Sequence, residues 1–333
     1  MNERARFYEA SALLPPFVNV LHGVPAHIAE NACEIRLRAG RPVVVETPSE
    51  RYLCRDTLVS CEDIHKCVKF FCDYSLYSRE RELAEGRITL KGGHRAGFTG
   101  TALMRAGEIT ALRDISSVNL RIAAEHKGIA EKLMSLTVFE RDLRGLLLLG
   151  APLSAKTTML RDLARLISAF ARTSIIDENG EIAAMYNGVP QHDIGLNCDV
   201  LDMFPKAEGI MRAVKLMSPE YLICDEVGGE YRTLAEQAGK GVKMILTAHC
   251  GDMREAACNT AVRTLVSSGA VNRIALLGSG TEIGKVKGLW RVSNAEDIGG
   301  CGNGSDLYRC GSRILNASEK KVRTAPISSV AVG

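Results

Sequence analysis

A run of nine residues has the types and the order of a phosphate-binding loop. The run consists of Gly150, Ala151, Pro152, Leu153, Ser154, Ala155, Lys156, Thr157 and Thr158. It follows a leucine run and precedes apolar residues at helical spacing, so it would connect a buried strand to a helix N-terminus. In that setting Lys156 would contact the β- and γ-phosphates of a nucleotide, and the Thr157 hydroxyl would bind Mg²⁺.

The loop departs from the sequence G-x-x-x-x-G-K-[ST] at its second glycine, where Ala155 stands. Glycine is used there because the backbone approaches the phosphates closely, with torsions that cost a residue bearing a Cβ about 1 kcal/mol. Alanine is the smallest residue that brings this cost, so it either weakens nucleotide binding modestly or prevents it. The alternative interpretation is a strand, a turn and a helix that contain a lysine by chance.

A second group of polar residues follows the apolar run Tyr221–Cys224. Asp225, at the end of this buried strand, would hold Mg²⁺ through water, and Glu226 would polarise an attacking water. Adjacent carboxylates at a strand end often form only a solvated turn. Together with a phosphate-binding loop upstream, they favour a nucleotide hydrolase.

Two further strands are expected to end in polar side chains. One is followed by Asp177, Glu178 and Glu181, and the other by Thr247 and His249. In open α/β sheets the residues that contact ligands gather at the carboxyl ends of the strands. A lone histidine is usually structural, but the position of His249 favours a role in sensing the γ-phosphate.

The part of the chain that carries these residues has a different hydropathy pattern from the part that precedes it. The alternation in Glu34–Arg38, the capping-box pair Ser60 and Asp63, and a turn at Arg105–Glu108 predict an α+β domain of helices and hairpins. The later apolar strands, separated by helical stretches, predict an α/β domain with a parallel sheet covered on both faces.

These differences predict four parts of the chain. We expect an N-terminal α+β domain over residues 1–125 and a linker over 126–143. The nucleotide-binding α/β domain would cover 144–293, and a flexible C-terminal tail would cover 294–333.

Composition excludes several classes of protein. The chain has 333 residues, 46% of them hydrophobic, and a net charge of +3, which is typical of a folded protein and too small to indicate nucleic-acid binding. No stretch approaches the ~18 apolar residues of a membrane-spanning helix, and the charged N-terminus lacks a secretory signal. Eleven cysteines without a C-x-x-C pair argue against zinc and redox motifs and predict free thiols in a reducing cytoplasm.

With these residues in place, the chain resembles the stage III sporulation protein AA family of endospore-forming bacteria, which belongs with the ring-forming ATPases of type II and type IV secretion systems. Besides the phosphate loop and the strand ends, the resemblance rests on Glu34–Arg38, Tyr74–Tyr77, Gly92–Arg95, Leu112–Ser117, Met217–Glu220 and Cys224–Gly228. It implies a RecA-like P-loop ATPase domain behind a smaller N-terminal domain, assembled as a hexamer. It also implies a role in the mother cell, powering the channel to the forespore.

The same resemblance implies roles for residues that the motifs alone do not assign. Asp177, Glu178 and Glu181 resemble the acidic box of secretion ATPases, and His249 resembles their histidine box.

Three arginines are further candidates by resemblance. Arg113 and Arg121 stand where arginines reach the nucleotide of a neighbouring subunit or domain, and Arg212 is a weaker candidate for the same work.

Two departures from the family bear on hydrolysis. Leu153 and Ala155 stand where the family usually has glycines, and Gly229 stands where it usually has an arginine, with Arg232 three residues later.

Three functions remain open at this point. The first is an ATPase motor that uses ATP and Mg²⁺, forms a homo-oligomeric ring in the mother-cell cytoplasm and is recruited to the membrane by proteins of the sporulation channel. The second is a nucleotide-binding or catalytically degenerate scaffold at the base of that channel. The third, a nucleic-acid motor, is disfavoured because one Trp and 5% aromatic residues offer few stacking platforms, so no stable nucleic-acid partner is expected.

Overall fold

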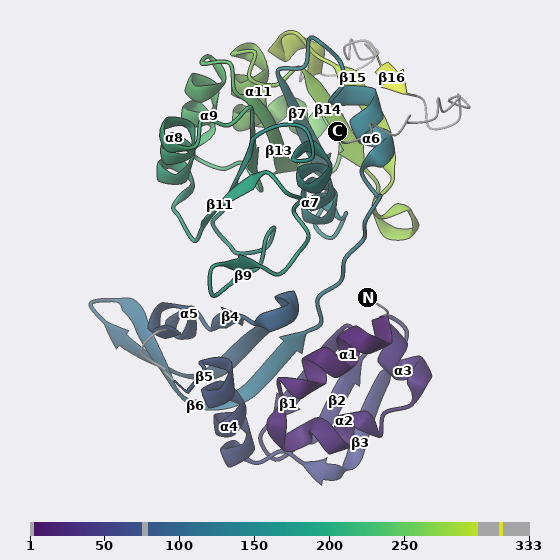
Figure 1. Ribbon diagram of the computed structural model, residues 1–333, viewed down its shortest axis with the longest axis vertical. Helices are drawn as coiled ribbons and strands as arrows, with labels where there is room; N and C mark the ends of the chain where they lie inside the picture. Colours follow the sequence, from purple (N-terminus) through teal and green to yellow (C-terminus); the bar gives the residue numbers. More distant parts are fainter. Residues whose placement is uncertain (1–2, 75–78, 299–312, 316–333) are drawn as a thin grey trace, which may run out of the picture. The chain divides into compact units, whose positions relative to one another are not determined.

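The computed structural model describes residues 3–74, 79–298 and 313–315 (Figure 1). The chain divides into two compact units. Unit 1 comprises Met1–Gly128 and Asp177–Leu196, and unit 2 comprises Ile129–Ile176 and Asn197–Gly333. Most of the expected tail and part of the Tyr74–Tyr77 motif lie outside the described residues.

Unit 1 is built on an antiparallel sheet with the strand order β3-β2-β1-β6-β5-β4. Its strands are β1 (Glu34–Arg38), β2 (Pro42–Glu46), β3 (Arg51–Leu58), β4 (Arg87–Thr89), β5 (Arg95–Arg105) and β6 (Glu108–Arg121). Its helices are α1 (Glu3–Ala12), α2 (Val18–His22), α3 (Ala26–Asn31), α4 (Cys61–Phe71) and α5 (Glu80–Ala84). Sheet and helices share one apolar core, so the expected α+β class is confirmed.

Local sequence explains these elements. In β1 the side chains of Ile35 and Leu37 are fully buried, as the alternation predicts. The capping box of α4 is present: the Ser60 hydroxyl accepts from the Asp63 backbone N–H, and the Asp63 carboxylate accepts from that of Ser60. β5 and β6 form a hairpin whose two central residues, Ala106 and Gly107, both have positive φ, the geometry that suits the twist of a two-residue turn.

Unit 2 is built on a mixed sheet with the strand order β11-β8-β12-β13-β7-β14-β15-β16. Its strands are β7 (Gly145–Gly150), β8 (Thr173–Asp177), β11 (Cys198–Asp202), β12 (Tyr221–Cys224), β13 (Lys243–His249), β14 (Arg273–Leu277), β15 (Val286–Arg291) and β16 (Arg313–Leu315). β8, β12, β13, β7 and β14 pair in parallel, whereas β15 and β16 run antiparallel to their neighbours. The expected parallel core is therefore confirmed.

Helices cover both faces of the unit 2 sheet (Figure 1). They are α6 (Glu131–Thr137), α7 (Lys156–Ile167), α8 (Lys206–Leu216), α9 (Tyr231–Ala238), α10 (Met253–Cys258) and α11 (Thr260–Ser267). α8, α9, α10 and α11 share a core with Leu147 and Leu149 of β7. Leu146 and Leu148 alternate with these and are equally buried, and α7 packs against the sheet on their side.

Residues 177–196 leave unit 2 directly after β8 and fold as part of unit 1. This segment contains the short hairpin of β9 (Met185–Tyr186) and β10 (Val189–Pro190). Ion pairs hold it: Arg95 lies 2.5 Å from Glu181, and Lys127 lies 2.5 Å from Asp193. Further hydrogen bonds join Arg87 to Asn179, Gly92 to Gln191, Arg79 to Asn187 and Tyr186 to Asp73.

The Gly92–Arg95 motif packs tightly within unit 1. Gly92 has a φ of +80°, so its backbone requires glycine, and a Cβ there would also displace the end of the Glu9 side chain. His94 is fully buried, and its Nδ1 accepts from the Ala123 backbone N–H at 3.1 Å. Its Nε2 therefore carries the proton and lies 3.6 Å from Oε2 of Glu9.

The expectation that every cysteine is a free thiol is wrong for Cys258, which is disulfide-bonded. The free thiols are Cys33, Cys54, Cys61, Cys67, Cys72, Cys198, Cys224 and Cys250. No helix in the described part of the chain has both the length and the apolar character needed to cross a membrane.

Unit 1 should lose stability in acid through His94. Burial, and to a smaller extent the charge of Arg6, lowers the pKa of His94 from 6.5 to about 4. Between pH 6.5 and 4 the His94 imidazole is protonated in the unfolded chain but stays neutral in the folded chain. The free energy of unfolding therefore falls by about 3 kcal/mol across this range. Hydrogen exchange of the β1 and β6 amides across this range would measure the loss.

His94→Gln should flatten that dependence, whereas His65→Gln, on the exposed side of α4, should leave it unchanged. Equal pH dependence in the native protein and His94→Gln would contradict the assignment.

Candidate functional site

The phosphate-binding loop has the expected setting between β7 and α7. β7 is buried along its whole length and ends at Gly150, and α7 begins at Lys156. A Cβ on Gly150 would lie 2.2 Å from Oγ of Ser154, so only glycine fits where the loop turns back on itself. Ser154 Oγ is buried and has no hydrogen-bond partner within the described residues, which leaves a polar group of the loop available to an anion.

Two residues of the loop adopt the left-handed conformation that glycine tolerates. Leu153 has φ +63°, and Ala155 has φ +67° and ψ +30°. Each costs about 1 to 2 kcal/mol relative to glycine. The Leu153 side chain is 89% exposed, so burial of its apolar surface does not offset this cost. Both loop residues that stand in place of glycine are therefore points of backbone strain.

The ammonium of Lys156 lies beneath the loop. Nζ donates to the backbone oxygens of Gly150 and Ala151, both at 2.9 Å. Burial lowers the pKa of Lys156, and the negative charges of Asp225 and Glu226 partly offset this effect. The two carbonyls thus hold the ammonium against the first residues of the loop.

Asp225 joins three elements at the carboxyl edge of the sheet. Its Oδ2 accepts from the Thr157 hydroxyl at 2.6 Å, and its Oδ1 accepts from the Thr247 hydroxyl. β13 lies between β7 and β12, so the three side chains come from the start of α7 and from the ends of neighbouring strands. A hydroxyl and a carboxylate in contact are the oxygen donors that Mg²⁺ prefers.

Glu226 is held by contacts to its backbone and its side chain. Its backbone N–H donates to the Thr247 hydroxyl at 2.7 Å, and its backbone oxygen accepts from Nζ of Lys206 at 2.5 Å. Its Oε1 lies 2.9 Å from Nε2 of His249, whose Nδ1 lies 3.1 Å from Nζ of Lys156. Because the lysine can only donate, Nδ1 accepts and Nε2 carries the proton.

The predicted residues Lys156, Thr157, Asp225, Glu226 and His249 therefore lie together in unit 2. An ammonium under a loop, a paired hydroxyl and carboxylate, and a second carboxylate bonded to a histidine can bind phosphates, hold a cation and orient a water.

The acidic residues at the end of β8 and just after it belong to unit 1. Asp177 is buried, and its carboxylate accepts from the backbone N–H groups of Glu181, Ile182 and Ala183. It therefore fixes the turn that starts the segment, while the Glu181 side chain pairs with Arg95. Glu178 is half-buried next to Asp177.

The candidate arginines are exposed and paired with acidic side chains. Arg113 lies 3.5 Å from Asp114, and Arg121 lies 3.4 Å from Glu34, all in unit 1.

The third arginine, Arg212, lies in unit 2 on α8. It pairs with Glu208 one turn earlier and stacks over Phe204.

Sequence reasoning missed two contacts of the site. It placed Thr247 with His249 at a strand end suited to sensing the γ-phosphate. It did not predict that the Thr247 hydroxyl contacts both Asp225 and Glu226. It did not consider Lys206, whose contact with Glu226 spans 20 residues and has no counterpart in any local pattern.

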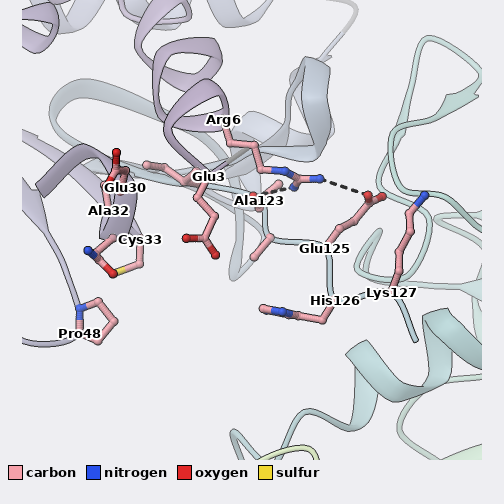
Figure 2. A pocket seen from close by; sticks show the side chains of 13 residues that line it. Glu3, Arg6, Glu30, Ala32, Cys33, Pro48, Ala123, Glu125, His126 and Lys127 are labelled. Carbon is pink, nitrogen blue, oxygen red and sulfur yellow. Dashed lines mark hydrogen bonds and ion pairs between the residues drawn. The ribbon is translucent and has the colours of Figure 1, made fainter. Parts of the chain in front are cut away.

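Unit 1 contains a separate hollow of about 340 Å³ (Figure 2). In Figure 2 the Arg6 side chain points toward Glu125, and the two groups pair at 3.2 Å. Glu125 also accepts from the backbone N–H of Asp193. The central charges of this hollow are thus satisfied within unit 1, and we assign it no ligand.

Comparison with known proteins decides the family. The sequence model of the family "Sporulation stage III, protein AA" matches residues 18–295 of this chain. The chain is also 36% identical over 302 residues to Stage III sporulation protein AA of Bacillus subtilis (strain 168), covering 88% of this chain and 95% of that protein. The chain belongs to this family. The resemblance inferred from the motifs is confirmed.

Solved structures show the fold of this family member. The ATPase DotB of Legionella pneumophila superimposes with a TM-score of 0.51 at 14% identity, covering 79% of this chain and 76% of that one. The pilus retraction motor PilT with bound ADP gives a TM-score of 0.53 at 18% identity, covering 74% of each chain. The expected RecA-like fold of a secretion ATPase is confirmed, and at these identities the likeness concerns the fold alone.

The strain at Ala155 leads to a prediction of stability. Ala155→Gly should raise the free energy of unfolding of unit 2 by about 1 kcal/mol, because glycine adopts φ +67° without a Cβ clash. Urea unfolding followed through the fluorescence of Trp290, which is buried in β15, would measure the gain.

Ala151→Gly is the matched control, because Ala151 lies in the same loop and is not left-handed. It should lower stability by about 0.5 to 1 kcal/mol. Equal losses of stability in both variants would contradict strain at Ala155.

Proposed function

We propose that this protein binds ATP with Mg²⁺ at the carboxyl edge of the unit 2 sheet and hydrolyses the bond between the β- and γ-phosphates. The observation that carries the proposal is the direct bond from the Thr157 hydroxyl to the Asp225 carboxylate, beside the buried ammonium of Lys156. Glu226, which the sheet places next to this pair, supports hydrolysis in addition to binding.

Each residue has a role that follows from its contacts. Lys156 would exchange its two carbonyl partners for the β- and γ-phosphate oxygens, which accept more strongly because they are charged. Thr157 would bind Mg²⁺ directly, and Asp225 would hold it through water. Held by these two residues, Mg²⁺ would supply positive charge beside the phosphates.

Glu226 would orient and polarise the attacking water. In the structure its carboxylate is bonded to the Nε2–H of His249, so it must exchange this partner for the water. Since Nδ1 of the same ring faces Lys156, His249 contacts both the phosphate-binding residue and the base. It is placed to report the presence of the γ-phosphate to Glu226.

Other parts of the proposal rest on family membership. Arg113 and Arg121 would reach the nucleotide from a neighbouring subunit or domain, and Asp177 and Glu178 would contribute to nucleotide binding. Assembly as a homo-oligomeric ring, with six subunits as the expected number, would supply the neighbour. We further propose that the ring works in the mother-cell cytoplasm, where membrane proteins of the sporulation channel recruit it and ATP hydrolysis powers that channel.

A second candidate function is a scaffold at the base of the channel that binds nucleotide without turnover. The left-handed Leu153 and Ala155 favour it, because a stiffer loop with two Cβ atoms approaches phosphate less closely than a glycine loop. The contacts of Glu226 with His249 oppose it, because a scaffold has no use for a general base.

ATP binding and turnover, measured side by side over a range of protein concentrations, decide between these functions. Glu226→Gln should retain ATP binding and lower kcat by about 10²- to 10⁴-fold, since it removes only the base. Lys156→Ala should remove binding. Glu236→Gln, which neutralises an exposed carboxylate on α9, is the control and should turn over ATP as the native protein does.

Binding without turnover in the native chain, or turnover that appears only in Ala155→Gly, would establish the scaffold instead of the motor.

A further inference from the structure

The backbone of Glu226 has an unusual conformation. Its φ is +54°, in the left-handed region that residues with a Cβ rarely adopt. Such strain persists only where the surrounding structure fixes the residue. Thr247 holds the N–H and Lys206 holds the carbonyl oxygen, so both peptide groups that flank the Cα are fixed.

Lys206 stands at a position that local preferences disfavour. It is the first residue of α8, directly after Pro205. The N-terminus of a helix carries a partial positive charge, so a lysine there is unfavourable to the helix itself. The ammonium instead extends to the carbonyl oxygen of Glu226, 20 residues later, at 2.5 Å. A lysine at a helix N-terminus, where it is unfavourable, indicates that its bond to the Glu226 carbonyl oxygen stabilises the tertiary structure.

We propose that Lys206 is a positioning residue for hydrolysis: its bond to the Glu226 carbonyl fixes the direction in which the Glu226 carboxylate points. This inference rests on the proposed function, in which Glu226 orients the attacking water. A charge-assisted bond is shorter and stronger than one between neutral groups, so Lys206 holds the strained peptide more firmly than an uncharged donor does.

The first test separates binding from turnover. Lys206→Met keeps the length of the side chain and removes the donor, and it should lower kcat by about 10- to 100-fold, because a small misplacement of a catalytic group has effects of this size. The dissociation constant for ATP should change less than about twofold, because the phosphate-binding residues are untouched. Lys206→Arg should restore most of the turnover, and Lys215→Met, on the exposed last turn of α8, should resemble the native protein.

The second test needs neither nucleotide nor turnover. Hydrogen exchange of the Glu226 and Val227 amides, which bond to the hydroxyl and carbonyl oxygens of Thr247, should become at least about tenfold faster in Lys206→Met and stay unchanged in Lys215→Met.

The outcomes distinguish this inference from the proposed function. The inference is overturned if Lys206→Met lowers kcat no more than Lys215→Met, or if exchange at Glu226 and Val227 is the same in both. If the native protein turns over ATP no faster than Glu226→Gln, the proposed hydrolysis fails, and the exchange experiment alone decides whether Lys206 fixes this peptide.

Discussion

The site depends on one carboxylate. Asp225 accepts hydrogen bonds from the hydroxyls of Thr157 and Thr247 and so joins the start of α7 to the ends of β12 and β13. Because β13 lies between β7 and β12, residues from separate parts of the chain reach this point without a long loop. The parallel pairing of buried strands supplies the rigidity, since β12, β13 and β7 are each paired with a strand on both sides.

Three residues of this site have a left-handed backbone. Leu153, Ala155 and Glu226 are all left-handed, and all lie within the loop or at the strand end that the loop faces. Such conformations cost free energy and survive where surrounding contacts over-determine them. Around Glu226 those contacts come from Thr247, Lys206 and His249. The site thus combines a rigid sheet with a few polar bonds that oppose the backbone's own preference.

The segment 177–196 lies between two stretches of unit 2 in the sequence but folds with unit 1. The chain passes between the two units after residues 128, 176 and 196, so β8 leads from the parallel sheet straight into a segment that folds with unit 1. Asp177 closes the first turn of that segment, and Arg95 and Lys127 hold it by ion pairs. The acidic residues that the resemblance connects with the nucleotide are therefore part of the fold of unit 1.

The sequence by itself determined the strand, loop and helix around residues 150–156, the strand-end carboxylates and the family, because each depends on residue types at short fixed spacing. Periodicity likewise determined the buried strands, and the spacing of Ser60 and Asp63 determined the capping box. Only the tertiary structure decided that residues 177–196 fold with unit 1 and that Lys206 contacts Glu226. These features arise from pairings between residues far apart in the chain, whose free energy depends on packing and strand order and leaves no local pattern.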